Sequence, residues 1–126
     1  MSRQGVKTFA RTLRYRNQTV TSLDGSQTTI LVGQEKGVDV RLALDIVGFA
    51  LADRYDVALV FSQDQDLSEV ADEIRTIAAQ QSRWIKIASA FPVSPAWSNK
   101  RGINKTDWIR ITRSQYDQCI DPTDYR

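Results

Sequence analysis

Residues 56–66 read DVALVFSQDQD, an apolar run followed at once by two acidic residues that alternate with glutamine. The nearly continuous apolar run Asp56–Phe61 is typical of a parallel strand that is covered on both faces. Leu67–Gln80 follows with apolar residues at helical spacing, which predicts an amphipathic helix. Trp84–Ala88 reads as a second strand, so residues 56–88 form a unit of 33 residues, the usual size of a βαβ crossover. The predicted fold class is therefore α/β.

A further helix and a hairpin are predicted on the amino-terminal side of this unit. Val38–Leu51 reads as a mostly buried helix, because its large apolar residues repeat at helical spacing. Gln18–Leu23 and Ser26–Val32 are rich in Thr, Val and Ile and are separated by Asp24-Gly25, which strongly indicates a β-hairpin. Residues 6–14 are predicted to form a short helix, since two apolar residues lie four apart on one face.

Shorter elements are predicted on the carboxyl-terminal side. Phe91–Gly102 contains two prolines and reads as an irregular loop. Trp108–Thr112 is predicted as a last edge strand, and Ser114–Ile120 as a short helical turn. Because no internal repeat, low-complexity tract or linker interrupts the chain, residues 1–126 are predicted to form a single domain.

The composition excludes several kinds of site. There is no histidine, and Cys119 is the only cysteine, which rules out Ser-His-Asp and Cys-His catalysis, histidine metal sites and thiolate zinc clusters. The usual glycine-rich loops for nucleotide phosphates are also missing. No apolar run approaches the length of about 20 residues that spans a bilayer, and the amino terminus lacks the pattern of a secretory signal. We expect a cytoplasmic protein with no membrane partner.

The net charge is +2, but basic and acidic residues are unevenly distributed along the chain. Residues 1–34 carry five basic side chains and one acidic one, residues 35–82 carry four and ten, and residues 83–126 carry eight and four. An acidic middle between basic ends fits a protein that binds a polyanion near a carboxylate cluster. Acidic residues on solvated helix faces would give the same pattern.

Asp64 and Asp66 are the most informative carboxylates, because they follow a predicted strand. Ligands of parallel α/β sheets collect beyond the carboxyl ends of the strands. Two carboxylates about 4 Å apart repel by about 4 kcal/mol at an effective dielectric constant of about 20, so a divalent cation such as Mg²⁺ or Mn²⁺ would suit them. Alternatively, Asp66 with Glu69 three residues later reads as a capping box, and the two roles are compatible.

Asp39 is a further candidate at the start of the predicted helix Val38–Leu51. A negative charge at this position is also explained by the helix dipole alone. Asp45 lies about 240° further round the helix and is predicted to form an ion pair with Arg41 instead.

Three motifs in this order resemble the NYN-domain family of PIN-like, metal-dependent ribonucleases. They are Glu35–Asp45 (EKGVDVRLALD), Tyr55–Ala58 (YDVA) and Ser62-x-Asp64-x-Asp66. The resemblance implies a Rossmann-like, three-layer parallel sheet with flanking helices and acidic residues at its carboxyl edge. By position, Asp39 matches the acid of the family motif K-G-V-D-V, and Asp64 and Asp66 match those of S-G-D-x-D. Gln63 replaces the glycine of that motif.

The resemblance implies a metal-dependent endoribonuclease that hydrolyses phosphodiester bonds of single-stranded RNA. Asp39, Asp64 and Asp66 would hold Mg²⁺ or Mn²⁺, which activates water and stabilises the departing oxygen. The RNA backbone and an unpaired base would be held by basic residues of the flanks and one aromatic ring: Arg14, Arg16, Lys100, Arg101, Lys105 and Trp97. Trp97 packed under its loop is the structural alternative.

The beginning of the chain departs from the family pattern. NYN domains begin with an apolar strand that ends in an acidic residue, whereas the only acidic residue before Glu35 is Asp24 in the hairpin turn. The resemblance therefore implies a missing first strand and first helix. It also implies an unfilled strand position beside Asp56–Phe61, through which copies could associate. It leaves open a catalytically weak, RNA-binding or regulatory module as the alternative function. A phosphatase or receiver-like acidic pocket on the same sheet is a further alternative.

Overall fold

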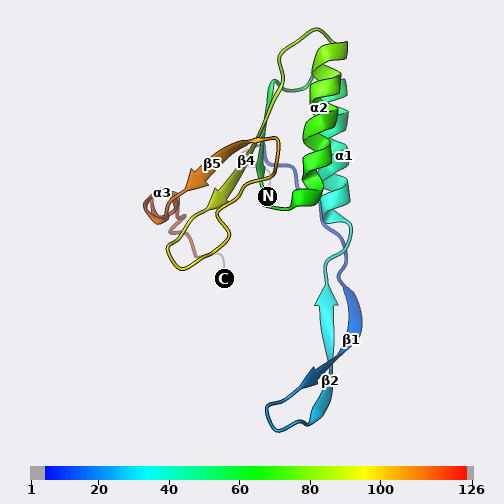
Figure 1. The fold of residues 1–126 in the computed structure, drawn as a ribbon, viewed down its shortest axis with the longest axis vertical. Helices are drawn as coiled ribbons and strands as arrows, with labels where there is room; N and C mark the ends of the chain where they lie inside the picture. The colour runs from blue at the N-terminus through cyan, green and yellow to red at the C-terminus, as the bar shows by residue number, and fades with distance from the viewer. Residues whose placement is uncertain (1–4, 125–126) are drawn as a thin grey trace. The chain divides into compact units, whose positions relative to one another are not determined.

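The computed structural model describes residues 5–124, and the chain divides into two compact units, Met1–Leu42 and Ala43–Arg126 (Figure 1). The first unit contains strands β1 (Arg14–Thr21) and β2 (Gln27–Gln34). Helix α1 (Val38–Leu51) begins in the first unit and ends in the second. The prediction that residues 1–126 form one domain stays a prediction.

The first unit confirms the predicted hairpin. Strands β1 and β2 pair antiparallel, from Arg14 opposite Gln34 to Thr21 opposite Gln27. Gly25 has a φ of +83°, a conformation that glycine adopts without steric cost, which explains the Asp-Gly signal. Beside it, Asp24 accepts hydrogen bonds from the backbone and hydroxyl of Ser26, and these bonds lower the pKa of the Asp24 carboxyl.

The predicted helix over residues 6–14 is wrong. Residues 6–13 form neither helix nor strand, and Arg14 already belongs to β1. A helix shorter than about 12 residues is marginal in water unless its apolar face packs against other residues. Phe9 is instead half-exposed, and its ring lies under the guanidinium groups of Arg11 and Arg41, at 5.4 and 5.5 Å.

The second unit contains a parallel three-stranded sheet in the order β3-β4-β5. Its strands and helices follow α1 in this sequence: β3 (Val57–Phe61), the 3-10 turn η1 (Gln65–Leu67), α2 (Ser68–Gln80), β4 (Lys86–Pro92), β5 (Asp107–Ile111) and α3 (Arg113–Asp117). The predicted βαβ unit is confirmed as β3-α2-β4, and the predicted edge strand as β5. The predicted strand Trp84–Ala88 begins two residues later than expected and continues to Pro92, inside the predicted loop.

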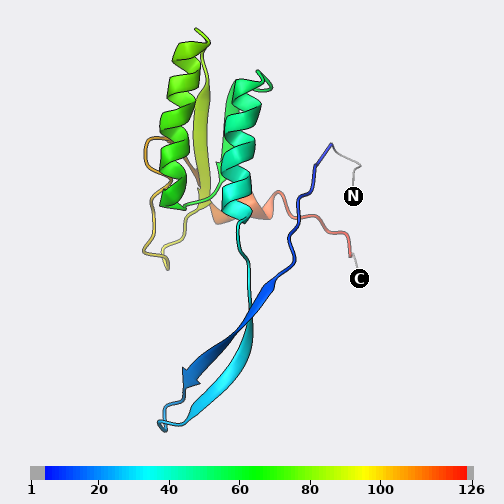
Figure 2. The same ribbon diagram turned by 90° about the vertical axis from the view of Figure 1, so that its right-hand side faces the viewer.

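The helices α1 and α2 lie together on one face of this sheet (Figures 1 and 2). The core of this unit contains buried apolar residues of α1, α2 and β4: Ile46, Ala50, Val70, Ala71, Ile74, Ile77, Ile87 and Phe91. None of the helices among residues 5–124 combines the length and the apolar character needed to cross a membrane.

β3 is not covered on both faces, contrary to the prediction. Val57, Leu59 and Phe61 alternate along the strand and are 49%, 49% and 71% exposed, whereas Val60 is buried. Because α1 and α2 share one face, the apolar run of β3 packs through its even-numbered residues only. The three-layer arrangement implied by the resemblance stays a prediction.

One arginine joins the end of α1 to the start of β3. The side chain of Arg83 is 17% exposed, and it donates hydrogen bonds to the carbonyl oxygens of Ala50 at 2.8 Å and Tyr55 at 3.0 Å. Its guanidinium also pairs with Asp53 and Asp56, at 3.2 and 3.3 Å. The burial that surrounds this junction raises the pKa of the Tyr55 hydroxyl.

We expect Arg83→Met to lower the free energy of unfolding by about 2–3 kcal/mol, because two partly buried carbonyl groups lose charged donors. Urea unfolding followed by circular dichroism measures this change. Arg54→Met, at an exposed position nearby, is the control and should change stability by less than about 0.5 kcal/mol. Equal stability of both variants would contradict the role given to Arg83.

Candidate functional site

The two candidate acids of the second unit lie in the segment that connects β3 to α2. Asp64 is the N-cap of η1, and its Oδ1 accepts a hydrogen bond from the backbone N–H of Asp66 at 3.0 Å. The backbone N–H of Asp64 in turn donates to Ser62 Oγ at 3.1 Å. This segment is therefore held in one conformation by its own short polar side chains.

The alternative role of Asp66 as the cap of the predicted helix is not confirmed, because Asp66 lies within the 3-10 turn η1, which is capped by Asp64. A 3-10 turn precedes α2, so helical structure begins earlier than the apolar periodicity indicated. The N-cap residue of α2 itself is Leu67, which makes no side-chain capping bond. Asp66 thus lies in the first turn of η1, where a negative charge is favourable.

Both carboxylates are exposed and carry only oxygen donors. Mg²⁺ is commonly held by one or two carboxylates, keeps several waters and contacts substrate phosphates, and Mn²⁺ also prefers oxygen ligands. The donor set of Asp64 and Asp66 fits such an ion. Among the residues that the structure describes, neither unit by itself gathers three acidic or cysteine side chains into a group that could hold a metal.

Two glutamines that alternate with these acids fasten the segment to a second loop. Gln63 Nε2 donates to the carbonyl oxygen of Arg101 at 2.9 Å, and Gln65 Nε2 donates to that of Gly102 at 2.9 Å. The amide of Gln65 makes a second bond to this loop, because its Oε1 accepts from the backbone N–H of Asn104 at 3.0 Å. Residues 62–66 and 99–104 therefore support each other, and this glutamine clamp (Gln63 and Gln65) fixes the backbone that carries the acids.

The sequence interpretation missed the glutamine clamp. Comparison with the family motif identifies Gln63 only as a departure from glycine. The only signal in the sequence is the alternation of glutamine with aspartate over residues 63–66.

The second loop rests on a buried polar group in β4. Ser89 is fully buried, and its Oγ accepts a hydrogen bond from the backbone N–H of Ile103 at 3.0 Å and pairs with Thr106 Oγ1 at 2.9 Å. The carbonyl oxygen of Ile103 accepts from Trp108 Nε1 at 2.8 Å. Because Gly102 and Ile103 are buried, this loop connects the clamp to the core of the sheet.

The family model for the NYN domain matches residues 2–94. The chain belongs to the NYN-domain family. This confirms the resemblance found in the sequence. Comparison with the curated proteins and with the solved structures gives no match. Members of the NYN family are in general metal-dependent ribonucleases that bind RNA, so a nuclease-like function follows from the family.

The third candidate acid of the NYN domain belongs to the other unit. Asp39 lies in the first turn of α1, after Gly37, whose φ of +80° turns the chain into the helix. The helix dipole favours its charge there. The approach of Asp39 to Asp64, like the ion pair of Asp45 with Arg41, stays a prediction.

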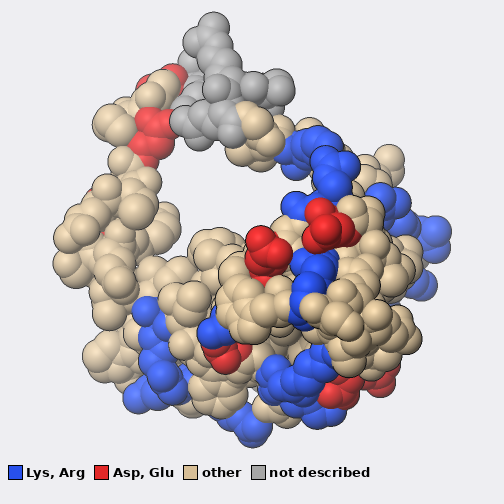
Figure 3. Space-filling model, turned by 90° about the horizontal axis from the view of Figure 1, so that it is seen from above, with Lys and Arg blue, Asp and Glu red and all other residues tan. Residues whose placement is uncertain are grey.

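The basic residues proposed to contact RNA have different surroundings in this chain. Lys105 forms an ion pair with Asp72 of α2 at 2.5 Å, and this contact lowers the pKa of the Asp72 carboxyl. Arg101 donates to Asn104 Oδ1 at 2.9 Å, and Lys100 is exposed. On the face drawn in Figure 3, acidic side chains lie beside basic ones, so this face carries no field of a single sign.

The remaining three candidates for RNA contact are exposed. Arg14 and Arg16 lie on β1 in the first unit. Trp97 is 56% exposed and lines a cavity, so it does not pack under its loop as the structural alternative required. Contact of these residues with RNA stays a prediction.

Proposed function

We propose that this NYN domain is an endoribonuclease that hydrolyses phosphodiester bonds of single-stranded RNA with Mg²⁺ or Mn²⁺. The observation that carries the proposal is the placement of Asp64 and Asp66 directly after a parallel strand, in a chain of the NYN family. Ligand sites of parallel sheets form at this edge. Asp39 is included because it matches the acid of the K-G-V-D-V motif.

The cation would be held by Asp39, Asp64 and Asp66. When bound, such an ion supplies Lewis acidity, which activates water and stabilises negative charge on the leaving oxygen. Asp64 is oriented for this role by the hydrogen bond from Asp66 N–H to its Oδ1, and the glutamine clamp holds the backbone in place. Preorganised ligands of this kind cost no reorganisation when substrate binds.

The RNA backbone would be held by Arg14, Arg16, Lys100, Arg101 and Lys105, with Trp97 as a stacking surface. Of these, Lys100 has the most accessible charge in the second unit, since Arg101 and Lys105 already bind protein groups. The proposed location is the cytoplasm.

We also propose that copies of the chain associate through β3. In the sheet of the described residues, β3 is paired only with β4, so its other edge presents backbone donors and acceptors beside exposed Val57, Leu59 and Phe61. Edges of this kind template the addition of another strand. Sedimentation measures the resulting oligomer, and a monomer at high concentration would refute this part.

Removal of the metal tests the proposed activity. We expect the chain to cleave a single-stranded RNA oligonucleotide in Mg²⁺, to lose cleavage in excess EDTA, and to regain it when Mg²⁺ or Mn²⁺ is returned. Gel analysis of end-labelled RNA measures the rate, and the same sequence annealed to its complement tests the preference for single strands. Cleavage that persists in EDTA, or RNA binding without cleavage in Mg²⁺, would refute the proposal.

A further inference from the structure

An apolar pocket opens at the edge of the sheet where its three strands end. It is lined by the last residue of each strand, namely Phe61 of β3, Pro92 of β4 and Ile111 of β5. Its volume of about 670 Å³ lies within the range that small organic ligands occupy. The pocket therefore lies at the same edge of the sheet as Asp64 and Asp66.

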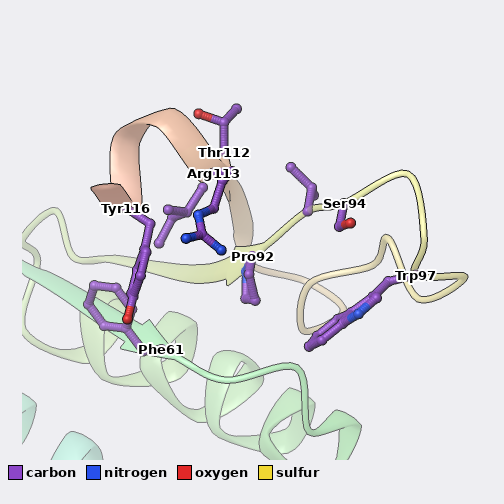
Figure 4. A pocket seen from close by; sticks show the side chains of 9 residues that line it. Phe61, Pro92, Ser94, Trp97, Thr112, Arg113 and Tyr116 are labelled. Atoms are coloured by element: carbon purple, nitrogen blue, oxygen red, sulfur yellow. The ribbon is translucent and has the colours of Figure 1, made fainter. Parts of the chain in front are cut away.

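Three exposed aromatic rings and one guanidinium surround this pocket. Phe61 and Tyr116 lie at one end, Arg113 in the middle and Trp97 at the other end (Figure 4). Phe61, Trp97 and Tyr116 are 71%, 56% and 58% exposed. Large apolar rings gathered on a surface are a common mark of a binding site.

The helix that carries Arg113 and Tyr116 is fixed by its own contacts. Thr112 and Gln115 form a capping box at the start of α3. Arg113 Nε donates to Asp117 Oδ1 at 2.7 Å, and the Arg113 guanidinium lies 5.8 Å from the centroid of the Tyr116 ring. The cationic and aromatic groups of the pocket are thus oriented before any ligand arrives.

We infer that this pocket binds an unpaired base of the RNA, with an aromatic ring stacked on it and Arg113 directed at the adjoining phosphate. Bases stack on aromatic side chains whatever their sequence, and arginine pairs with phosphate through a planar fork. The inference rests on the proposed function for its choice of RNA as the ligand.

The position of the pocket favours RNA over a protein ligand. Phe61 lies three residues before Asp64, so their Cα atoms are at most about 11 Å apart, and one RNA strand can reach both sites. Lys100 and Arg101 follow Trp97 closely in the chain and add positive charge on that side. Trp97, Arg113 and Tyr116 lie outside residues 2–94, the part that matches the family. Phe61 and Pro92 lie inside the matched part, so the pocket is formed by residues from both parts of the chain.

The test measures binding of the full chain to a fluorescein-labelled decauridine RNA in EDTA, so that no cleavage is needed for a signal. We expect Trp97→Ala and Tyr116→Ala each to weaken binding about tenfold, the loss typical of one stacking surface, and Trp97→Phe to restore most of it. Trp84→Ala is the matched control, because Trp84 is 63% exposed and lies before β4, at the opposite end of that strand. A ribose-phosphate decamer without bases should bind about tenfold more weakly than decauridine to the unchanged chain, and Trp97→Ala should not affect it.

Each alternative result has a defined meaning. Equal effects of Trp97→Ala and Trp84→Ala, or equal binding of the decamers with and without bases, would overturn the base pocket. A dimer that dissociates on Trp97→Ala without a change in RNA affinity would assign the pocket to a second copy and overturn it too. Base-dependent binding in a chain that does not cleave RNA would leave the pocket standing and refute only the proposed activity.

Discussion

Asp64→Asn is expected to lower the Mg²⁺-dependent rate of RNA cleavage by at least about 100-fold, the loss typical of one preorganised charge-stabilising group. The fold should be nearly unchanged, because the asparagine Oδ1 can still accept the hydrogen bond from Asp66 N–H. Cleavage rates at saturating Mg²⁺, together with urea unfolding, measure both quantities. A large loss of cleavage without a loss of stability would separate the cation ligand from the helix cap.

Two further variants sharpen this result. Asp64→Ala removes the cap as well as the charge, so it should lose cleavage and also about 1 kcal/mol of stability. Glu73→Gln removes an exposed acid of α2 that has no proposed ligand role and should leave the cleavage rate unchanged. If Asp64→Asn cleaves as fast as Glu73→Gln, Asp64 is a helix cap and not a ligand.

Gly102→Ala is expected to lower the free energy of unfolding by about 2–3 kcal/mol, as overpacking of a filled core does. A Cβ at this buried position would lie 2.4 Å from Ser89 Oγ, 2.6 Å from the Trp108 ring and 2.8 Å from the Phe91 ring. None of these groups can retreat cheaply, since Ser89 and Phe91 are buried and the Trp108 indole N–H is bonded to Ile103.

The same substitution should also disturb the site, because the carbonyl oxygen of Gly102 accepts from the Gln65 side chain. We expect slower cleavage even at temperatures where the variant is folded. Gly48→Ala is the matched control, since a Cβ there meets nothing within 4 Å. In a helix this change should stabilise the chain by about 0.5–1 kcal/mol. A Gly102→Ala variant as stable as the unchanged chain would show that loop 99–104 can shift away from the sheet at little energetic cost.

Most of the regular structure could be predicted because its signals are local. The apolar spacing of Val38–Leu51 predicts a helix with the bounds that α1 has, and Asp24-Gly25 predicts the hairpin turn. The predictions fail where residues that are distant in the sequence determine the local structure. Residues 6–13 have helical spacing but no helix, and the exposed face of β3 depends on where α1 and α2 lie.

The candidate site, too, could be predicted only where the signals are local. Placing Asp64 and Asp66 at the end of β3 needed only the order of the elements along the chain. Asp64, and not Asp66, is a cap because a 3-10 turn precedes α2. The apolar periodicity of the sequence does not reveal this turn. The glutamine clamp joins residues 37 to 39 positions apart, so no local pattern could reveal the partners of Gln63 and Gln65.

The hairpin β1-β2 also determines where the chain tolerates foreign sequence. Residues 22–26 at its tip are exposed, and the hydrogen bonds that shape them join Ser22, Asp24, Gly25 and Ser26 only to one another. Insertions at such polar tips disturb few contacts. An epitope or a small reporter domain spliced after Asp24 would leave every bond of the glutamine clamp and of the sheet β3-β4-β5 intact. The tip is thus a suitable site for labels that follow the protein in a cell.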